Sequence, residues 1–177
     1  MENNNHLTQI DFSHKFSNFW LIELMGKQGV HELLTENFNN RNFKIRSKEL
    51  HPKISFLYHK DHRFSTFYHF KNKENTSQNF ETLQQHKFGI DYFYSSEKKN
   101  QISANGTVFL NNYNGNQQSP VAYQMLEGLQ AGRNYTWNLL LNHKINTILN
   151  LSVSYLGRKS EDSKTIHTGS VQLKAIF

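Results

Sequence analysis

Apolar and polar residues alternate with a period of two along much of this chain. The clearest run spans residues 134–144, where Tyr135, Trp137, Leu139, Leu141 and His143 alternate with residues that are polar except for Leu140. Successive side chains of a strand point to opposite faces, so this run predicts a strand with one apolar and one polar face. Similar runs predict strands over residues 7–14, 19–27, 50–58, 63–71, 86–95, 101–111, 147–158 and 167–177. Many approach the roughly 9–11 residues that a tilted strand needs to cross a bilayer.

The connections between these predicted strands alternate in length. Short ones fall at 15–18, 59–62, 96–100 and 143–146, and long ones at 28–49, 72–85, 112–133 and 157–166. Outer-membrane barrels have short periplasmic turns and long external loops. With the end of the chain in the periplasm, every short connection lies on the periplasmic side and every long one outside.

One segment inside a long connection departs from the period of two. Residues 119–132, SPVAYQMLEGLQAG, place Val121, Met125 and Leu126 at helical spacing. Pro120 near the start and Gly132 after the end suit a short helix. We expect this helix to pack on the external loop; a plug or partner contact is the alternative.

Composition narrows the function classes. The 177 residues contain no cysteine, 14 Phe and 8 Tyr, and carry a formal charge of +6. The basic residues are scattered rather than clustered, which argues against a nucleic-acid partner. The polar start lacks the features of a secretory signal, and no run approaches the roughly 18 apolar residues of a membrane helix. A mean hydropathy of −0.73 does not exclude a membrane barrel, because half of its strand residues face a polar lumen.

These patterns predict an all-β fold: an antiparallel up-and-down transmembrane β-barrel of about 8–10 strands, with residues 1–177 as a single segment of a larger barrel. Aromatic residues near both ends of the strands match the two interfacial girdles, and the chain ends on a strand with a terminal Phe. Residues expected to face lipid or its interface are Tyr135, Trp137, Leu139, Leu141, Leu149, Leu151, Val153, Tyr155, Val171, Leu173 and Phe177. Residues expected to face the lumen are Lys53, Arg63, Lys87, Asp91, Lys144, Arg158 and Lys174.

Three segments resemble a known group of proteins: ENFNNRNFKIRS, SPVAYQMLEGLQAGRNYTW and YLGRKSEDSKTIHTGSVQLKAIF. From about Trp20 onward the chain resembles the C-terminal barrel portion of large, uncharacterised outer-membrane proteins of Bacteroidota. The resemblance implies a fold and a location and brings no catalytic motif. Ala175 stands where an aromatic residue is frequent in the terminal pattern of such barrels.

Candidate chemistry is sparse. His51, His59, His62 and His69 lie close in sequence, but the further ligands of a zinc site are missing, so we expect no metal and no cofactor. His143 faces outward and the nearby serines 152 and 154 face inward, which does not suit a hydrolase. The single acids Glu23 and Asp91 are expected to pair with lumenal lysine or arginine. The charged loop 158–164 is expected to be solvated. We therefore predict no enzyme activity.

The sequence thus predicts an outer-membrane barrel segment whose parent serves transport, secretion or surface anchoring. Its expected partners are outer-membrane lipid and, through the last strand, the barrel-assembly machinery. An odd strand count and the missing signal predict a fragment of a longer chain. Two alternatives stay open: a soluble up-and-down barrel that binds an apolar ligand, and a membrane-embedded hydrolase.

Overall fold

A computed structural model gives the fold and describes residues 2–36, 42–77, 80–96 and 99–175. It consists of one nine-stranded antiparallel sheet in which every strand pairs with its neighbours in the chain. The strands are β1 Glu2–Lys15, β2 Trp20–Leu34, β3 Phe43–Tyr58, β4 His62–Asn75, β5 Glu81–Ser95, β6 Asn100–Asn114, β7 Gly132–Lys144, β8 Leu149–Ser160 and β9 Ile166–Ala175. One helix, α1 Pro120–Leu126, lies between β6 and β7. The predicted all-β, up-and-down architecture is confirmed.

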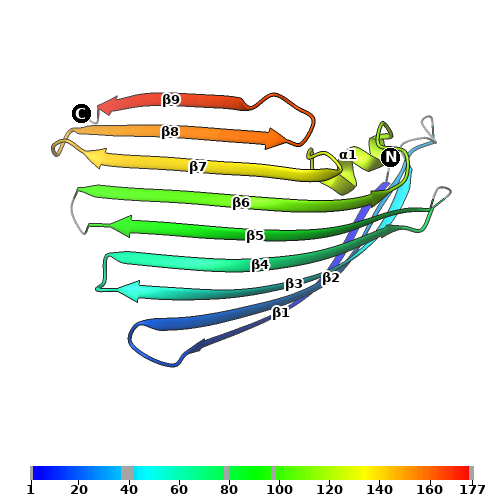
Figure 1. Ribbon diagram of the computed structural model, residues 1–177, viewed down its shortest axis with the longest axis horizontal. Coiled ribbons are helices and arrows are strands. Elements are labelled where there is room, and N and C mark those ends of the chain that lie inside the picture. Colours follow the sequence, from blue (N-terminus) through cyan, green and yellow to red (C-terminus); the bar gives the residue numbers. More distant parts are fainter. Residues whose placement is uncertain (1, 37–41, 78–79, 97–98, 176–177) are drawn as a thin grey trace.

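The sheet is curved, and its hairpin turns and longer connections gather at opposite ends (Figure 1). We call these the turn end and the loop end. Helix α1 and the chain start lie at the loop end, whereas β9 finishes at the turn end (Figure 1). Within the described residues no pairing joins β1 to β9, so both remain edge strands.

Several strands are longer than the alternation predicts, always toward the loop end. Strand β3 begins at Phe43 rather than near Leu50, and β4 continues to Asn75. In the extension of β3 the apolar residues change sides: Lys44 and Arg46 continue the side that carries Leu50 and Ile54, whereas Phe43 and Ile45 lie on the other side. The apolar pattern of the first side therefore ends while the backbone ladder continues. As a result the predicted long connections are shorter, and residues 115–131 form the longest of them.

The register defines two faces of the sheet. Odd-numbered residues of β1–β6 share a face with even-numbered residues of β7–β9, because directly opposed partners point the same way. Helix α1 packs on this face against Phe43 and Ile45 of β3 and Leu83 of β5, with Leu33 of β2 and Tyr113 of β6 at the border. A helix of seven residues can reach β2 and β6 together only where the sheet curls around it. We call this the concave face and the opposite one the convex face.

None of the helices in the described ranges has the length and apolar character needed to cross a bilayer.

Candidate functional site

Along most of the sheet the concave face carries the polar positions of the strands, with the apolar residues under α1 as exceptions. The register places all seven residues predicted to face the lumen on it: Lys53, Arg63, Lys87, Asp91, Lys144, Arg158 and Lys174. Many of its polar side chains are buried, among them Ser55, Ser65, Asn75, Gln85 and Asn134. Buried polar groups need partners, and many of these pair within the face: Ser55 Oγ lies 2.9 Å from Ser65 Oγ, and Gln85 Nε2 donates to Asn111 Oδ1 at 3.0 Å. Whether it lines a lumen remains a prediction.

Helix α1 covers the loop end of the concave face. It is shorter than the predicted segment 119–132 and ends at Leu126; the next residue, Glu127, adopts the left-handed conformation with φ 56°. The side chain of Ser119 caps its start by accepting a hydrogen bond from the Ala122 amide at 2.9 Å. Val121, Ala122, Met125 and Leu126 are buried against the sheet. The short helix expected in this long connection is confirmed, and its apolar side packs on β3 and β5 of the sheet.

Glu127 connects the helix to two buried lysines of β4. Its Oε1 lies 2.6 Å from Lys71 Nζ and 2.9 Å from Lys73 Nζ. Lys73 Nζ also donates to the Met125 carbonyl at 2.9 Å, which satisfies an acceptor that the short helix leaves free. Burial raises the pKa of Glu127, but the ammonium groups of Lys73 and Lys71 outweigh burial and bring the pKa to about 2. Glu127 is therefore ionised at neutral pH and holds the helix end on the sheet.

A second carboxylate, Glu49 of β3, extends this ionic cluster. Its Oε2 lies 2.9 Å from His69 Nε2 and its Oε1 lies 3.7 Å from Lys71 Nζ. His51 stacks on His69 with ring centroids 4.9 Å apart. No group of three or more metal-binding side chains occurs in the ranges that the structure describes. His51 and His69 therefore take part in a polar cluster on the concave face.

Aromatic rings flank the cations at the centre of the concave face. Lys87 Nζ lies 5.2 Å from the ring centroid of Phe67 and 5.3 Å from that of Phe109. Such cation–π contacts stabilise an ammonium group without a carboxylate. Phe67 lies directly over Gly89, where an added Cβ would come within 2.2 Å of the ring. Glycine is needed here because the ring occupies the place of a side chain.

The predicted pairing of the single acids holds for one of the two. Asp91 Oδ2 lies 3.6 Å from Lys53 Nζ, whereas no ion pair of Glu23 occurs among the described residues. Lys53 lies beside Phe67 on the concave face, and one strand separates it from β5.

An amide network fastens the connection after α1. Asn134 Nδ2 and Asn111 Nδ2 each donate to the Gln130 carbonyl at 2.8 Å. Asn134 Oδ1 accepts from the Gln130 amide at 3.2 Å and from Ser160 Oγ at 2.6 Å. The sequence analysis missed this network because its donors are ordinary strand asparagines. The close spacing of Gln130 and Asn134 is the one signal that could have suggested it.

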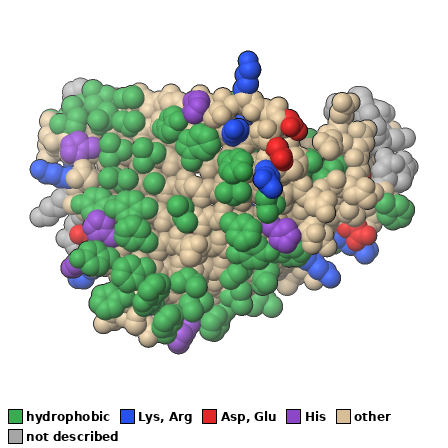
Figure 2. Space-filling model, viewed as in Figure 1, with side chains coloured by type: hydrophobic (Ala, Val, Ile, Leu, Met, Phe, Trp, Pro, Cys, Tyr) green, Lys and Arg blue, Asp and Glu red, His purple; other side chains and the backbone are tan. Residues whose placement is uncertain are grey.

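The convex face carries the residues predicted to meet lipid or its interface. The register places Tyr135, Trp137, Leu139, Leu141, Leu149, Leu151, Val153, Tyr155, Val171 and Leu173 there, and Phe177 lies outside the described residues. Leu139 is 44% exposed and Leu173 is 60% exposed. Apolar side chains gather over much of the face seen in Figure 2. The contact of these residues with lipid stays a prediction.

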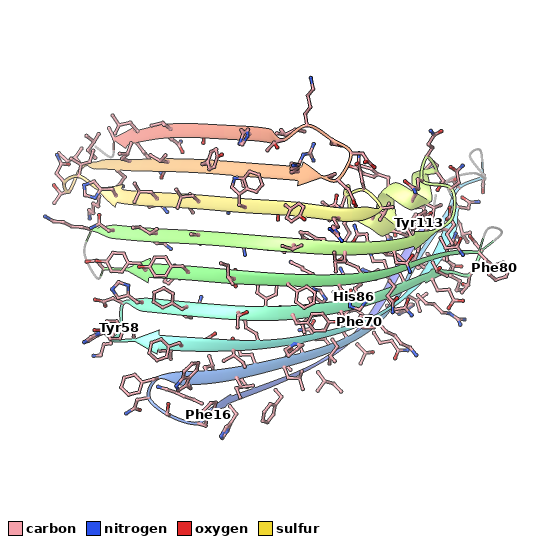
Figure 3. The ribbon with its side chains drawn as sticks, viewed as in Figure 1. Phe16, Tyr58, Phe70, Phe80, His86 and Tyr113 are labelled. Atoms are coloured by element: carbon pink, nitrogen blue, oxygen red, sulfur yellow. The ribbon has the colours of Figure 1, made fainter. Side chains whose placement is uncertain are left out.

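Aromatic contacts organise the convex face. Phe70 and His86, both labelled in Figure 3, have ring centroids 5.2 Å apart. Trp137 lies over Gly157 so closely that an added Cβ would be 1.9 Å from the indole. The ring therefore uses the space that this glycine leaves on the neighbouring strand.

Tyr58 lies at the turn end of the sheet (Figure 3).

His143 and the serines of β8 do not form the hydrolase-like pair that was considered in the sequence analysis. His143 lies on the convex face, whereas Ser152 and Ser154 lie on the concave face. Ser152 Oγ donates to Asn142 Oδ1 at 2.6 Å, and Ser154 Oγ lies 2.7 Å from Ser170 Oγ. A nucleophile and its base must be within hydrogen-bond reach, and these side chains are separated by the sheet.

Comparison with known proteins finds the same fold in outer-membrane proteins. A loop-deletion mutant of OmpT, an outer-membrane protein of Vibrio cholerae, superposes with a TM-score of 0.68 at 9% identity, covering 97% of this chain and 53% of that one. Outer-membrane expressed OmpT of the same organism gives a TM-score of 0.64 at 10% identity, covering 88% and 46%. No protein-family model matches the sequence, and neither does any curated protein. The chain thus spans about half the length of these solved structures and has the fold of outer-membrane β-barrels.

Proposed function

We propose that this chain forms part of the wall of an outer-membrane β-barrel, with its convex face in hydrocarbon and its concave face toward an aqueous lumen. The observation that supports it is an inverted distribution of side chains. Large apolar residues such as Ile54, Phe64, Ile90 and Leu139 are exposed on the convex face, while polar residues are buried on the concave face. A water-soluble barrel requires the reverse, because burying apolar surface drives its folding.

The height of the apolar band is consistent with this role. On β3 the convex residues from Leu50 to Tyr58 are Leu, Pro, Ile, Phe and Tyr. At a rise of about 3.3 Å per residue this band is about 26 Å long along the strand, which is about 20 Å in height for a strand tilted by about 40°. Barrels of the outer membrane carry an apolar band about 25 Å tall. Beyond it toward the loop end follow Lys48, Arg46 and Lys44, which would leave the hydrocarbon.

The edge strands suggest that the wall is incomplete. β1 and β9 each have one side without a strand partner among the described residues, and lipid cannot satisfy their free backbone groups. We infer that further strands of a longer parent chain complete the barrel. The resemblance to large Bacteroidota proteins and recognition of the last strand by the barrel-assembly machinery belong to the same proposal.

Among transport, secretion and surface anchoring, we favour passage of polar solutes through the lumen. Lysine and arginine outnumber aspartate and glutamate on the concave face. Helix α1 and its connection would narrow the lumen at the loop end, because they fill the concave side of β3–β5. A cationic wall favours anions over cations. The proposal assigns no catalysis to the chain.

Tryptophan fluorescence tests the orientation of the two faces. The chain has two tryptophans, Trp20 and Trp137, and both lie on the convex face. With the completed barrel in vesicles of brominated phosphatidylcholine, we expect strong quenching of both and little quenching by aqueous iodide. Single-tryptophan variants, Trp20→Phe and Trp137→Phe, would assign the signal to each position.

A matched control moves the probe by one residue. In Trp20→Phe/Thr136→Trp/Trp137→Phe the sole indole faces the concave side, and we expect iodide rather than bromine to quench it. Equal access of iodide to both faces, or bromine quenching of neither, would contradict the proposal and favour a water-soluble barrel.

Conductance tests the parent's role. In planar bilayers under a salt gradient, the parent protein should pass current with a preference for anions. Replacing Lys53 and Lys87 by Met should reduce that preference. A folded, inserted parent that passes no current would contradict transport and leave anchoring or secretion.

A further inference from the structure

Two cations project from the convex face just above the apolar band. Arg46 and Lys48 of β3 are exposed at the loop end. Their partners across the sheet are Val30 and Glu74 for Arg46, and Gln28 and Asn72 for Lys48. The next convex position toward the turn end is Leu50, which is 46% exposed. The cations therefore lie at the boundary between polar and apolar surface.

Neither cation is neutralised by a neighbour. Lys44 Nζ pairs with Glu32 Oε1 at 3.2 Å, but among the described residues no ion pair includes Arg46 or Lys48. Glu74 faces the same way as Arg46 on the adjacent strand without closing to ion-pair distance. Exposed cations without a partner are available to an external anion.

The surface beside these cations is hollowed and continues onto apolar residues. A hollow of about 480 Å³ is lined by Gln28, Gly29, Val30, Arg46, Ser47, Lys48, Asn72 and Glu74. A second hollow of about 560 Å³ shares Lys48 and Val30 and extends to Gly26 and Ile10. The space above Gly26 is open, because a Cβ placed there would meet nothing within 4 Å. The surface thus joins two cations to a shallow apolar path.

We propose that Arg46 and Lys48 bind the phosphate group of a lipid in the leaflet at the loop end, with an acyl chain along Gly26 and Ile10. The guanidinium group of Arg46 presents paired donors that match phosphate oxygens, and Lys48 adds a point charge. This inference rests on the proposed function, since it requires the convex face to lie in lipid. It deepens that function by naming the chemical class of the bound lipid.

A lipid fits the surface better than a free anion. A soluble phosphate would contact only the cations and would compete with Glu74 beside them. A lipid also covers apolar surface at Ile10, which is 73% exposed, and at Leu50. Burial of apolar area adds to the ionic contacts and favours the anchored ligand.

Lipid titration tests the proposal. The completed barrel of the parent chain would be held in phosphatidylcholine nanodiscs and titrated with bisphosphorylated lipid A, with bound lipid counted by native mass spectrometry. We expect Arg46→Gln/Lys48→Gln to weaken binding about tenfold, because two charge-assisted contacts are lost. Glu74→Gln should strengthen binding by removing a competing carboxylate, a gain that misfolding cannot produce.

The control variant removes equal charge from the other face. Lys144→Gln/Lys174→Gln lies on the concave side at the turn end and should bind lipid A as the unmodified chain does. Equal loss in both double variants, equal binding of dephosphorylated lipid A, or full displacement by inorganic phosphate would overturn the proposal. Bromine quenching of Trp20 and Trp137 in the same nanodiscs separates the two claims: quenching without a variant effect overturns only the lipid site.

Discussion

The two faces of this sheet are built from alternate residues of the same strands and yet follow opposite rules. On the convex face Leu139 and Leu173 are exposed, with Trp137 and Phe70 packed among other rings. On the concave face Lys71 and Lys73 are buried at 8% and 9% exposure and are paired with Glu127. In water the first arrangement is unfavourable and the second is costly. Together they favour the proposal that the solvent differs between the two faces, as it does at a bilayer.

The largest expected effect comes from placing a charge on the convex face. Leu139→Arg should destabilise the completed barrel in phosphatidylcholine vesicles by about 2–4 kcal/mol, because arginine is poorly tolerated at the bilayer midplane of a barrel. Leu140→Arg, one residue away on the concave face, should cost less than about 1 kcal/mol. Denaturant unfolding followed by tryptophan fluorescence measures both. Equal losses of stability in the two variants would contradict the proposed difference between the faces.

The next effect tests packing on the convex face. Gly157→Ala places a Cβ within 1.9 Å of the Trp137 ring, so the indole must leave its position. We expect a loss of about 1–3 kcal/mol, as for other overpacked sites. Gly169→Ala on the adjacent strand meets its nearest atom at 3.8 Å and should be close to neutral. The same unfolding measurement gives the free energy of unfolding of both variants. A Gly157→Ala variant as stable as the unmodified chain would contradict the packing of Trp137 over Gly157.

A smaller effect tests the ionic hold on α1. Glu127→Gln removes the carboxylate that both Lys71 and Lys73 contact, and we expect a cost on the order of 1 kcal/mol at neutral pH. The pKa of Glu127 is about 2 in the folded chain, below the value of about 4.3 for a free glutamate. Its contribution is therefore fully present above about pH 5 and is lost as the pH falls toward 2.

Unfolding midpoints of both chains between pH 7 and pH 2 would show this trend. The difference in stability between the unmodified chain and the Glu127→Gln variant should shrink as the pH falls. A constant difference across the range would mean that Glu127 acts by packing alone.

The smallest effect concerns the half-exposed pair between β3 and β5. Asp91→Asn removes the partner of Lys53, whose Nζ lies 3.6 Å away. Pairs with this exposure contribute about 0.2–1 kcal/mol and are screened by salt. The loss should therefore vanish in high salt, and a salt-independent loss of larger size would place the pair in a drier environment than the structure indicates.

Much of the sheet could be predicted from sequence, because alternation is a local signal. Residues 134–144 and 149–158 each carry an apolar residue at nearly every second position, which assigns both the strand and the face. Where outward residues become polar, as at Lys44, Arg46 and Lys48, the same signal disappears although the strand continues. The predicted strands therefore end too early at the loop end.

The site around α1 could be predicted only in part. Helical spacing revealed the helix, but not the surface on which it packs. Lys71 and Glu127 are 56 residues apart, and no local pattern in either segment points to the other. The sequence likewise does not indicate that the ring of Phe67 lies over Gly89. Nor does it indicate that the ring of Trp137 lies over Gly157. Such contacts depend on register between strands, which alternation alone does not specify.

The neighbour-to-neighbour order of the strands has a consequence for assembly. Each hairpin can form as soon as its second strand is available, because its ladder closes over a short stretch of chain. Helix α1 is different, since its contacts with Lys71 and Lys73 span 56 and 52 residues. This helix can dock only after β3 to β5 have joined, because its binding surface is made from these strands. Docking of α1 would therefore report that the sheet has become curved.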